Sequence, residues 1–435
     1  MDKNVLRVGF AKIDITPDYS VGLGGYADDH TRKNEKVIEN IYTTCIAFNE
    51  GDETILMYTN DLLSCTPAMA KQLRKSISKA TGVPDDKIYI AATHCHNAPS
   101  YNIEPKFKRE WKAACVKAAK QAIADLAPAK IFGAKKDLWG MNCVRHYITA
   151  EGTVGGSNFG TIRVGNPAVG YMARADSQIV LLKFEREEGK RPVLMVNWQG
   201  HPDTGREIGV LNLAPHFPGP MRDTLSALTG CLVAYFTGAD GNMAINSRIK
   251  RDEHNLTWRE YGVKMAHLAY DVMKEMKEVE GSGIATKREM VTVDVDHSWD
   301  HMLEQAKEVC HVWRTVGLKE GDALAKTYDF SSSYQANAII RRCDMDATDV
   351  LEINAIRVGG IGFTTGSYEM FSEAGTFVKQ NSPYEFTFLL TGNFKYIPST
   401  RAYDYRCYES DTGMYARGTG EKLAERYVEM LKELQ

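Results

Sequence analysis

Two histidines separated by one residue follow a short apolar segment of the chain. The apolar run at 87–92 predicts a strand, and the overlapping residues 92–99 have the sequence ATHCHNAP. Alternate residues of a strand point to the same face, so His94 and His96 are expected to face the same way at its carboxyl end. Paired imidazoles can bind a metal ion, transfer protons, or form a hydrogen-bonded structural pair. The residue types leave these alternatives open.

Other polar side chains follow apolar runs later in the chain. His201 lies in VNWQGHP, Glu369 in GSYEMF and Tyr396 in NFKYIPS. Loops after strand carboxyl ends are where α/β proteins gather functional groups. Imidazole and carboxylate donors suit zinc when one position stays open for water or substrate. These residues therefore indicate a candidate metal site.

An alternation of strands and helices is expected to position these residues. Thr66 can cap a helix over 66–82, Pro67 suits its first turn, and Gly82 ends it. Further helices are predicted over 108–128, 254–278 and 420–434, and strands over 43–51, 54–61, 87–96, 129–138, 176–185, 191–202, 230–241, 288–297 and 351–366.

This rhythm predicts the α/β class, with a mixed β-sheet core flanked by helices and a metal site in loops at strand carboxyl ends. No proline-rich linker, low-complexity segment or repeat divides the sequence, so we predict a single domain over 1–435. Residues 299–342 are helical in pattern and more charged, and could form a helical insertion or lid.

The composition excludes several classes of protein. The 435 residues are 43% hydrophobic and 25% charged, with a net charge of −3, which does not suggest a nucleic-acid partner. No apolar run approaches the ~18 residues that a membrane span needs. The first residues, MDKNVLRVGFAKIDITP, lack the apolar core of a signal peptide, and the nine cysteines form no CxxC pair. We therefore expect reduced thiols, a cytoplasmic location and a small-molecule substrate, and leave open a homo-oligomer.

Several motifs together resemble the catalytic domain of the neutral ceramidases and their bacterial relatives. In order along the chain they are RVGFAKIDITP, GLGGYA, ATHCHNAP, VNWQGHP, GADGNMAIN, SYEMFSEAG and KYIPSTRAYDYRCYE. They extend over nearly the whole sequence. We expect no counterpart of the family's immunoglobulin-like tail.

The resemblance implies one zinc ion per chain and assigns its neighbours. The implied zinc ligands are His94, His201, Glu369 and Tyr396. The groups implied to contact the substrate carbonyl are His96, Arg145 and Tyr408. Zinc activates water and polarises a carbonyl, and the other groups can donate to an oxyanion or shuttle a proton.

The sequence departs from the family pattern at several positions. Ala244 stands where many ceramidases carry a serine proposed as nucleophile, and Ser247 could replace it only through a loop change. His216, in LAPHFPG, could be an extra active-site base or a surface histidine. The acid Glu369 is kept, although Ser367 and Tyr368 replace the usual proline and glycine before it.

Three neighbouring residues have competing interpretations. Asp61 could orient a zinc-binding histidine or cap the following helix. Asp240 could bond a ligand, although a role in shaping the glycine-rich turn is favoured. His146, beside Arg145, is interpreted as structural.

We therefore predict a zinc-dependent hydrolase that cleaves an amide or ester of a small polar molecule by zinc-activated water. The loops carrying the candidate residues are rich in Asn, Asp, Arg, Ser and Tyr, which suits a polar ligand better than long-chain ceramide. Two alternatives remain: a zinc-dependent lyase or isomerase of a sugar-like compound, and a non-catalytic protein that binds through the metal pocket.

Overall fold

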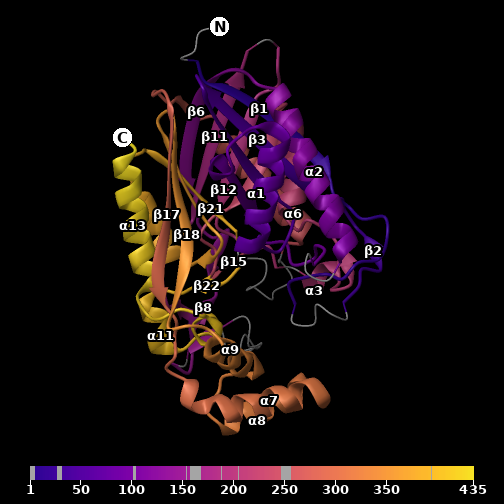
Figure 1. The fold of residues 1–435 in the computed structure, drawn as a ribbon, viewed down its shortest axis with the longest axis vertical. Coiled ribbons are helices and arrows are strands. Elements are labelled where there is room, and N and C mark those ends of the chain that lie inside the picture. Colours follow the sequence, from indigo (N-terminus) through magenta and orange to yellow (C-terminus); the bar gives the residue numbers. More distant parts are fainter. Residues whose placement is uncertain are drawn as a thin grey trace.

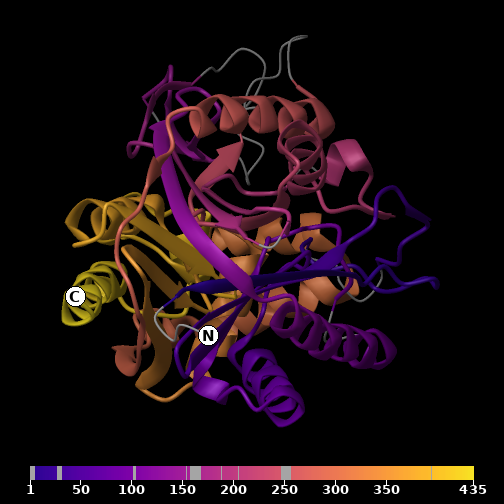
Figure 2. The same ribbon diagram turned by 90° about the horizontal axis from the view of Figure 1, so that it is seen from above.

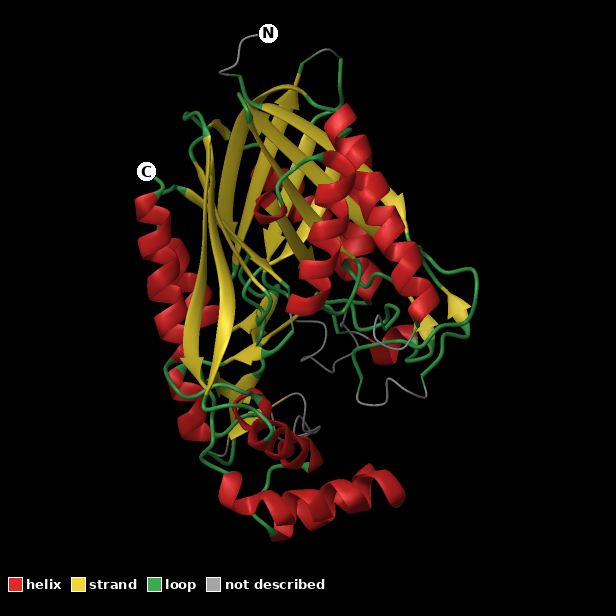
Figure 3. Cartoon of the chain, in the orientation of Figure 1, coloured by secondary structure: helices red, strands yellow, loops and turns green. Residues whose placement is uncertain are grey.

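Two β-sheets packed face to face form the core of the protein. The computed structural model describes residues 5–26, 32–100, 104–152, 154–156, 168–187, 189–203, 205–245, 256–392 and 394–435. Apolar side chains from both sheets meet in one buried cluster, including Phe48, Phe184, Phe363 and Phe388. Helices cover the outer face of each sheet, so the described chain has four layers in the order αββα (Figures 1 and 3).

The larger sheet is mixed and contains nine of the described strands. Its order is β14 (Leu232–Thr237), β12 (Val193–Trp198), β11 (Gln178–Arg186), β6 (Ala127–Asp137), β1 (Arg7–Asp14), β3 (Tyr42–Glu50), β4 (Glu53–Asn60) and β5 (Ile88–Ala92), with β16 (Lys277–Glu278) beside β6. The pairs β12–β14 and β4–β5 are parallel. Strands β5 and β12 are buried at every residue, which explains their continuous apolar sequences.

The smaller sheet has four strands and ends in a parallel pair. Its order is β17 (Ile284–Asp294), β18 (Thr348–Val358), β19 (Ile361–Gly366) and β21 (Phe386–Thr391), with β19 parallel to β21. The sequence pattern for 351–366 predicted a single strand. The structure contains a hairpin instead, because Gly359 has a φ of 55° and turns the chain between β18 and β19.

The outer helices bury apolar faces against the two sheets. On the larger sheet lie α1 (Pro67–Thr81), α2 (Pro105–Ala124), α4 (Pro218–Thr229) and α6 (Trp258–Met273), and on the smaller sheet lie α10 (Ser372–Asn381) and α13 (Thr419–Glu433). Figure 2 shows the yellow C-terminal helices on one side of the strands and the purple helices α1 and α2 on another. None of the helices in the described part of the chain is long and apolar enough to cross a membrane.

The predicted helical region forms a small unit with its own core. It contains η3 (Asp300–Met302), α7 (Leu303–Thr315), α8 (Leu318–Thr327) and α9 (Ser333–Cys343). Val309, Phe330 and Ile339 are among its buried core residues. Figure 1 places α7 and α8 beyond the ends of the sheets. The helical pattern is therefore present in the structure, and a role of this region as an insertion or lid stays a prediction.

Short elements fix the loops between the sheets and the helices. Two-stranded ladders join β20 (Glu369–Met370) to β22 (Tyr396–Ile397), β15 (Met243–Ile245) to β7 (Asn142–Val144), and β13 (Asn212–Leu213) to β2 (Lys36–Val37). The other short elements are β8 (His146–Thr149), β9 (Val154–Gly156), β10 (Ala168–Tyr171), η1 (Asp85–Lys87), α3 (Gly205–Ile208), α11 (Thr400–Tyr405) and α12 (Tyr408–Thr412).

Hydrogen bonds gather the carboxyl ends of strands from both sheets. Thr237, at the end of β14, donates its hydroxyl to the carbonyl of Thr93, just after β5, at 2.9 Å. Thr391, at the end of β21, donates to the carbonyl of Thr237 at 3.2 Å. The loops that follow β5, β14 and β21 therefore start close together, as the prediction of a site at strand carboxyl ends requires.

Candidate metal centre

Three buried imidazoles meet where these strand ends converge. His96 Nε2 lies 3.1 Å from His94 Nε2 and 3.1 Å from His201 Nε2. The three side chains form a group with the geometry to hold a metal ion. His96, assigned by resemblance to the substrate carbonyl, is therefore as close to this point as the two histidines assigned to zinc.

The imidazoles of His94 and His96 do lie together, as predicted. The predicted cause, alternation of side chains along a strand, is wrong. Strand β5 ends at Ala92, so both histidines lie in the loop that follows it. His94 has a φ of 65°, in the left-handed region that residues other than glycine rarely adopt. A turn, rather than strand alternation, thus brings the two rings together. The Sγ of Cys95, between the two histidines, bonds to the carbonyl of Ala214.

The outer nitrogens of two imidazoles contact neighbouring protein oxygens. His94 Nδ1 donates to the carbonyl of Leu63 at 2.7 Å. His201 Nδ1 lies 3.4 Å from the carbonyl of Asp240 and 3.5 Å from its carboxylate. A proton on Nδ1 leaves the lone pair of Nε2 directed at the centre, which is the arrangement of metal-binding histidines. Asp240 therefore lies against His201 with both its backbone carbonyl and its carboxylate, in addition to its place in the glycine-rich turn.

The ladder between β20 and β22 supplies the oxygen donors. Glu369 and Tyr396 are backbone partners in this parallel pair, so their side chains lie side by side. Glu369 Oε2 is 3.5 Å from His94 Nε2 and is buried. Gly241 lies against the same strand: its amide donates to the carbonyl of Met370, and a Cβ there would lie 2.9 Å from the carbonyl of Glu369.

The electrostatics of the centre favour a bound cation. Burial lowers the pKa of His94 to about 4, so its imidazole is neutral at pH 7. Burial raises the pKa of Asp240 to about 7, and burial together with Asp240 raises the pKa of Glu369 well above its usual range. A positive charge among these groups would reverse both increases, since it stabilises ionised carboxylates.

The distances also fit a tetrahedral ion. A zinc ion with Zn–N distances of about 2.0–2.1 Å holds its ligand nitrogens about 3.3 Å apart. The 3.5 Å between His94 Nε2 and Glu369 Oε2 is close to that value, and so are the 3.1 Å that separate His96 Nε2 from His94 and from His201, so the spacing admits His96 as a ligand as well. Glu369 Oε2 is moreover a buried oxygen for which the described residues supply no hydrogen-bond donor. The donor set and its spacing therefore suit zinc or a similar divalent ion.

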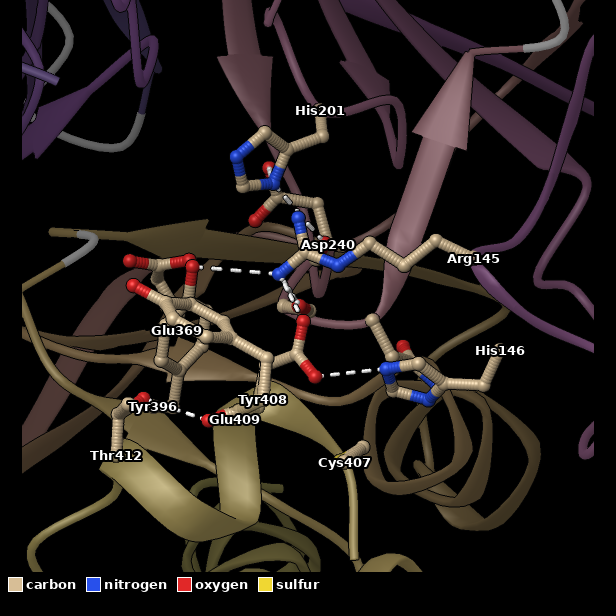
Figure 4. A network of polar contacts seen from close by, with 12 residues as sticks. Arg145, His146, His201, Asp240, Glu369, Tyr396, Cys407, Tyr408, Glu409 and Thr412 are labelled. Atoms are coloured by element: carbon tan, nitrogen blue, oxygen red, sulfur yellow. Dashed lines mark hydrogen bonds and ion pairs between the residues drawn. The ribbon is translucent and has the colours of Figure 1, made fainter. Parts of the chain in front are cut away.

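Arg145 and Tyr408 lie beside the oxygen donors, and Figure 4 shows Arg145 directed toward Tyr396 and Glu369. Arg145 Nη2 donates to the hydroxyl of Tyr396 at 3.2 Å and to the carbonyl of Gly241 at 2.7 Å. The ring of Tyr408 meets that of Tyr396 edge to face, with centroids 5.9 Å apart. The structure thus brings both predicted carbonyl-binding residues to the centre.

His216 is not the surface histidine that one interpretation proposed. Its side chain is fully buried, and its Nε2 donates to the side-chain oxygen of Asn97 at 3.0 Å. Asn97 follows His96, so His216 supports the loop that carries His96. Its role as a base stays a prediction.

Residue 244 contributes a methyl group in place of the serine hydroxyl. Ala244 is buried in β15, opposite Cys143 of β7. The ladder between these strands continues into a bond from the amide of Arg145 to the carbonyl of Asn242, at 2.8 Å. The segment therefore positions Arg145. Ser247 lies outside the described residues.

Sequence reasoning missed Glu409, whereas its interpretation of the neighbouring His146 as structural agrees with the contacts of that residue. Glu409 forms a buried ion pair with Arg145 and accepts a hydrogen bond from His146 at 2.7 Å. With Cys407, these two residues form a second group with metal-binding spacing. Both imidazole nitrogens of His146 are already engaged, one with Glu409 and the other with Tyr405. We interpret this group as a hydrogen-bonded support. A tyrosine–glutamate pair twelve residues after Tyr396 was the only available signal.

The loop GLGGYA approaches His96 with its backbone. Gly25 has a φ of 106°, and a Cβ there would lie 2.7 Å from the Cα of His96. Gly82 also has a positive φ, 80°, but a Cβ there would meet nothing within 4 Å. Both glycines have a positive φ, but only at Gly25 would a side chain collide with a neighbouring residue.

We expect Gly25→Ala to destabilise the protein by more than Gly82→Ala does. Each substitution carries a backbone penalty of about 1–2 kcal/mol, and only the first brings a Cβ against His96. Thermal unfolding of both variants measures the difference. Equal unfolding temperatures would show that the loop accommodates the methyl group without strain.

The fold and the site define a class: a four-layer αββα protein with a buried imidazole–carboxylate centre at one end of its two sheets. Comparison with solved structures gives a TM-score of 0.73 and 18% identity with a neutral ceramidase from Pseudomonas aeruginosa, over 99% of this chain and 74% of that one. A ceramidase complexed with C2 gives a TM-score of 0.73 and 16% identity, over 99% of this chain and 75% of that one. Comparisons of the sequence with protein families and with curated proteins found no match. The resemblance predicted from the motifs is confirmed for the fold.

Proposed function

We propose that this chain is a zinc-dependent hydrolase that cleaves an amide or ester bond of a small polar molecule. The observation that carries the proposal is a buried group of three imidazoles with metal-binding spacing and a buried carboxylate 3.5 Å from one of them. The fold shared with a neutral ceramidase supports the reaction class, because that protein's name denotes an amide hydrolase.

The proposed ligands remain His94, His201, Glu369 and Tyr396. The contacts of His94 with Leu63 and of His201 with Asp240 support these two, because metal-binding histidines usually bond through their second nitrogen. A bound zinc ion supplies a Lewis acid for the carbonyl and lowers the pKa of a water ligand to about 7.

Three other side chains are proposed to act on the substrate. His96 Nε2 faces the ligand nitrogens at 3.1 Å, where it can donate to the carbonyl oxygen or accept a proton. Arg145 can stabilise the negative charge that develops on that oxygen. Tyr408, packed against Tyr396, is the second proposed donor.

The attacking nucleophile is proposed to be water rather than a side chain. Ala244 offers no hydroxyl at the position of the family serine. The reaction is therefore expected to proceed without an enzyme-bound acyl group. Intact-protein mass spectrometry during turnover checks this, and an acyl adduct on any residue would contradict direct attack by water.

A polar substrate is supported by the groups near His96. Tyr26 packs edge-on against the ring of His96 and donates its hydroxyl to Asp203 at 2.6 Å. Burial of each CH₂ of an alkyl chain contributes roughly 0.8 kcal/mol only where apolar walls receive it. A hydroxylated or charged molecule suits this Tyr–Asp pair better.

The test combines metal analysis with a substrate panel. Purified protein should contain one zinc per chain, and it should hydrolyse small N-acyl compounds or lactones faster than long-chain ceramide in detergent. Absence of bound metal after growth with zinc would refute the site. Faster ceramide cleavage would refute the polar substrate, and conversion of sugars without release of an acid would favour the lyase or isomerase alternative.

A further inference from the structure

A network of hydrogen bonds begins at Arg145 and extends away from the metal centre. Tyr405 on α11 contacts His146 Nδ1 at 2.9 Å, and His146 Nε2 contacts Glu409 Oε2 at 2.7 Å. The other carboxylate oxygen of Glu409, on α12, forms an ion pair with Arg145. Figure 4 shows Glu409 between the arginine and the histidine.

This network has one consistent direction of proton donation. Glu409 accepts a hydrogen bond from His146 and forms an ion pair with Arg145, so His146 carries its proton on Nε2 and accepts from the Tyr405 hydroxyl at Nδ1. Burial raises the pKa of Glu409, but the charge of Arg145 and the bond from His146 outweigh it and lower the pKa to about 2. The carboxylate is therefore ionised and keeps both its donors at neutral pH.

The three residues of this network are buried. Arg145 and Glu409 are exposed by 2% and 1% of their side-chain areas, and His146 by 4%. The Nη2 group of Arg145 contacts Glu409, the hydroxyl of Tyr396 and the carbonyl of Gly241. Three contacts at one nitrogen hold this end of the guanidinium beside Tyr396.

We propose that Glu409 and His146 are positioning residues that hold the Arg145 guanidinium in place beside the metal centre. The inference rests on the proposed function, because it concerns the residue assigned there to the substrate oxygen. Glu409 acts directly on Arg145, and His146 acts through Glu409.

The test uses acetohydroxamate, a small chelator that places an oxyanion on bound zinc, and calorimetry measures its affinity for the zinc-loaded protein. We expect Arg145→Ala and Glu409→Gln each to weaken binding roughly tenfold to a hundredfold, as a displacement of about 1 Å can do. The double variant should bind no more weakly than Arg145→Ala alone, since the two residues act as a unit. Zinc content should stay at the wild-type value.

Two substitutions of His146 test the same proposal in case the Glu409→Gln protein does not fold. His146→Leu removes the donor to Glu409 and should weaken binding, whereas His146→Gln retains an N–H at the position of Nε2 and should restore most of it. Asp125→Asn is the matched control. Asp125 pairs with the buried Arg186, at the end of β11 opposite to the loop of His201. It should lower the unfolding temperature without changing acetohydroxamate affinity.

The outcomes separate the two proposals. Wild-type affinity in both Glu409→Gln and His146→Leu, or a double variant with multiplied losses, would overturn the positioning role while leaving the proposed function intact. Wild-type affinity in Arg145→Ala with zinc retained would overturn the role of Arg145 and, with it, this inference. Absence of zinc from the wild type, measured before acetohydroxamate is added, would overturn both proposals.

Discussion

Replacement of His201 by alanine should remove most of the zinc and nearly all hydrolytic activity. The substitution deletes one of three converging nitrogens and removes the ring beside the buried carboxylate of Asp240. Loss of a group that merely supports a metal ligand typically costs 10–100-fold in metal affinity, and loss of a ligand should cost more. Elemental analysis of purified protein and zinc titration with a chelator measure the change.

His267→Ala provides the control for this variant. His267 lies exposed on α6, so its replacement should leave both zinc content and activity unchanged. His94→Ala should behave as His201→Ala does. A His201→Ala protein that retains one tightly bound zinc would show that His201 is not a ligand.

Asp61→Ala should destabilise the fold by about 3–5 kcal/mol, the usual cost of leaving one partner of a buried ion pair alone. The carboxylate of Asp61 is fully buried and binds Arg222 through two hydrogen bonds, of 2.8 and 2.7 Å. It also accepts from the amide of Tyr42 at 2.9 Å. Denaturant unfolding measures the loss. The contacts assign Asp61 to an ion pair with α4, which neither of its sequence interpretations anticipated.

Two further variants distinguish the ion pair from a general effect of charge. Asp223→Asn removes the neighbouring carboxylate, which is 73% exposed and 3.5 Å from Lys12, and should cost less than about 1 kcal/mol. Asp61→Leu combined with Arg222→Met should recover much of the stability, because it leaves no buried charge. Equal stabilities of Asp61→Ala and Asp223→Asn would contradict this prediction, because they would mean that water solvates the unpaired charge of Arg222.

The local elements were predictable because their signals lie within a few residues. Thr66 caps α1 and Gly82 ends it in the left-handed conformation, as the sequence indicated. The pairing of two sheets was not predictable in this way. Phe48 and Phe363 pack across the sheets, yet each alone is compatible with any buried strand. Which sheet a strand joins depends on contacts between distant segments.

The site shows the same division between local and distant information. His94, His96 and His201 were predicted from their place after strands, and the structure brings them together. Glu409 was missed because its importance comes from one ion pair with Arg145, from a segment far away in the sequence. A carboxylate next to a tyrosine carries no such information by itself. The roles assigned to these residues stay predictions.

The division of the donors between the two sheets has a consequence for the order of folding. His94 and His201 follow strands of the larger sheet, whereas Glu369 and Tyr396 follow strands of the smaller one. Each sheet alone therefore carries half of the proposed ligand set, so we expect high-affinity zinc uptake only after the sheets have docked. A zinc-sensitive dye in stopped-flow refolding should report a phase later than the formation of secondary structure. Zinc at a thousand times its dissociation constant would then stabilise the docked state by about 4 kcal/mol. The bound ion would link the two sheets and slow their separation.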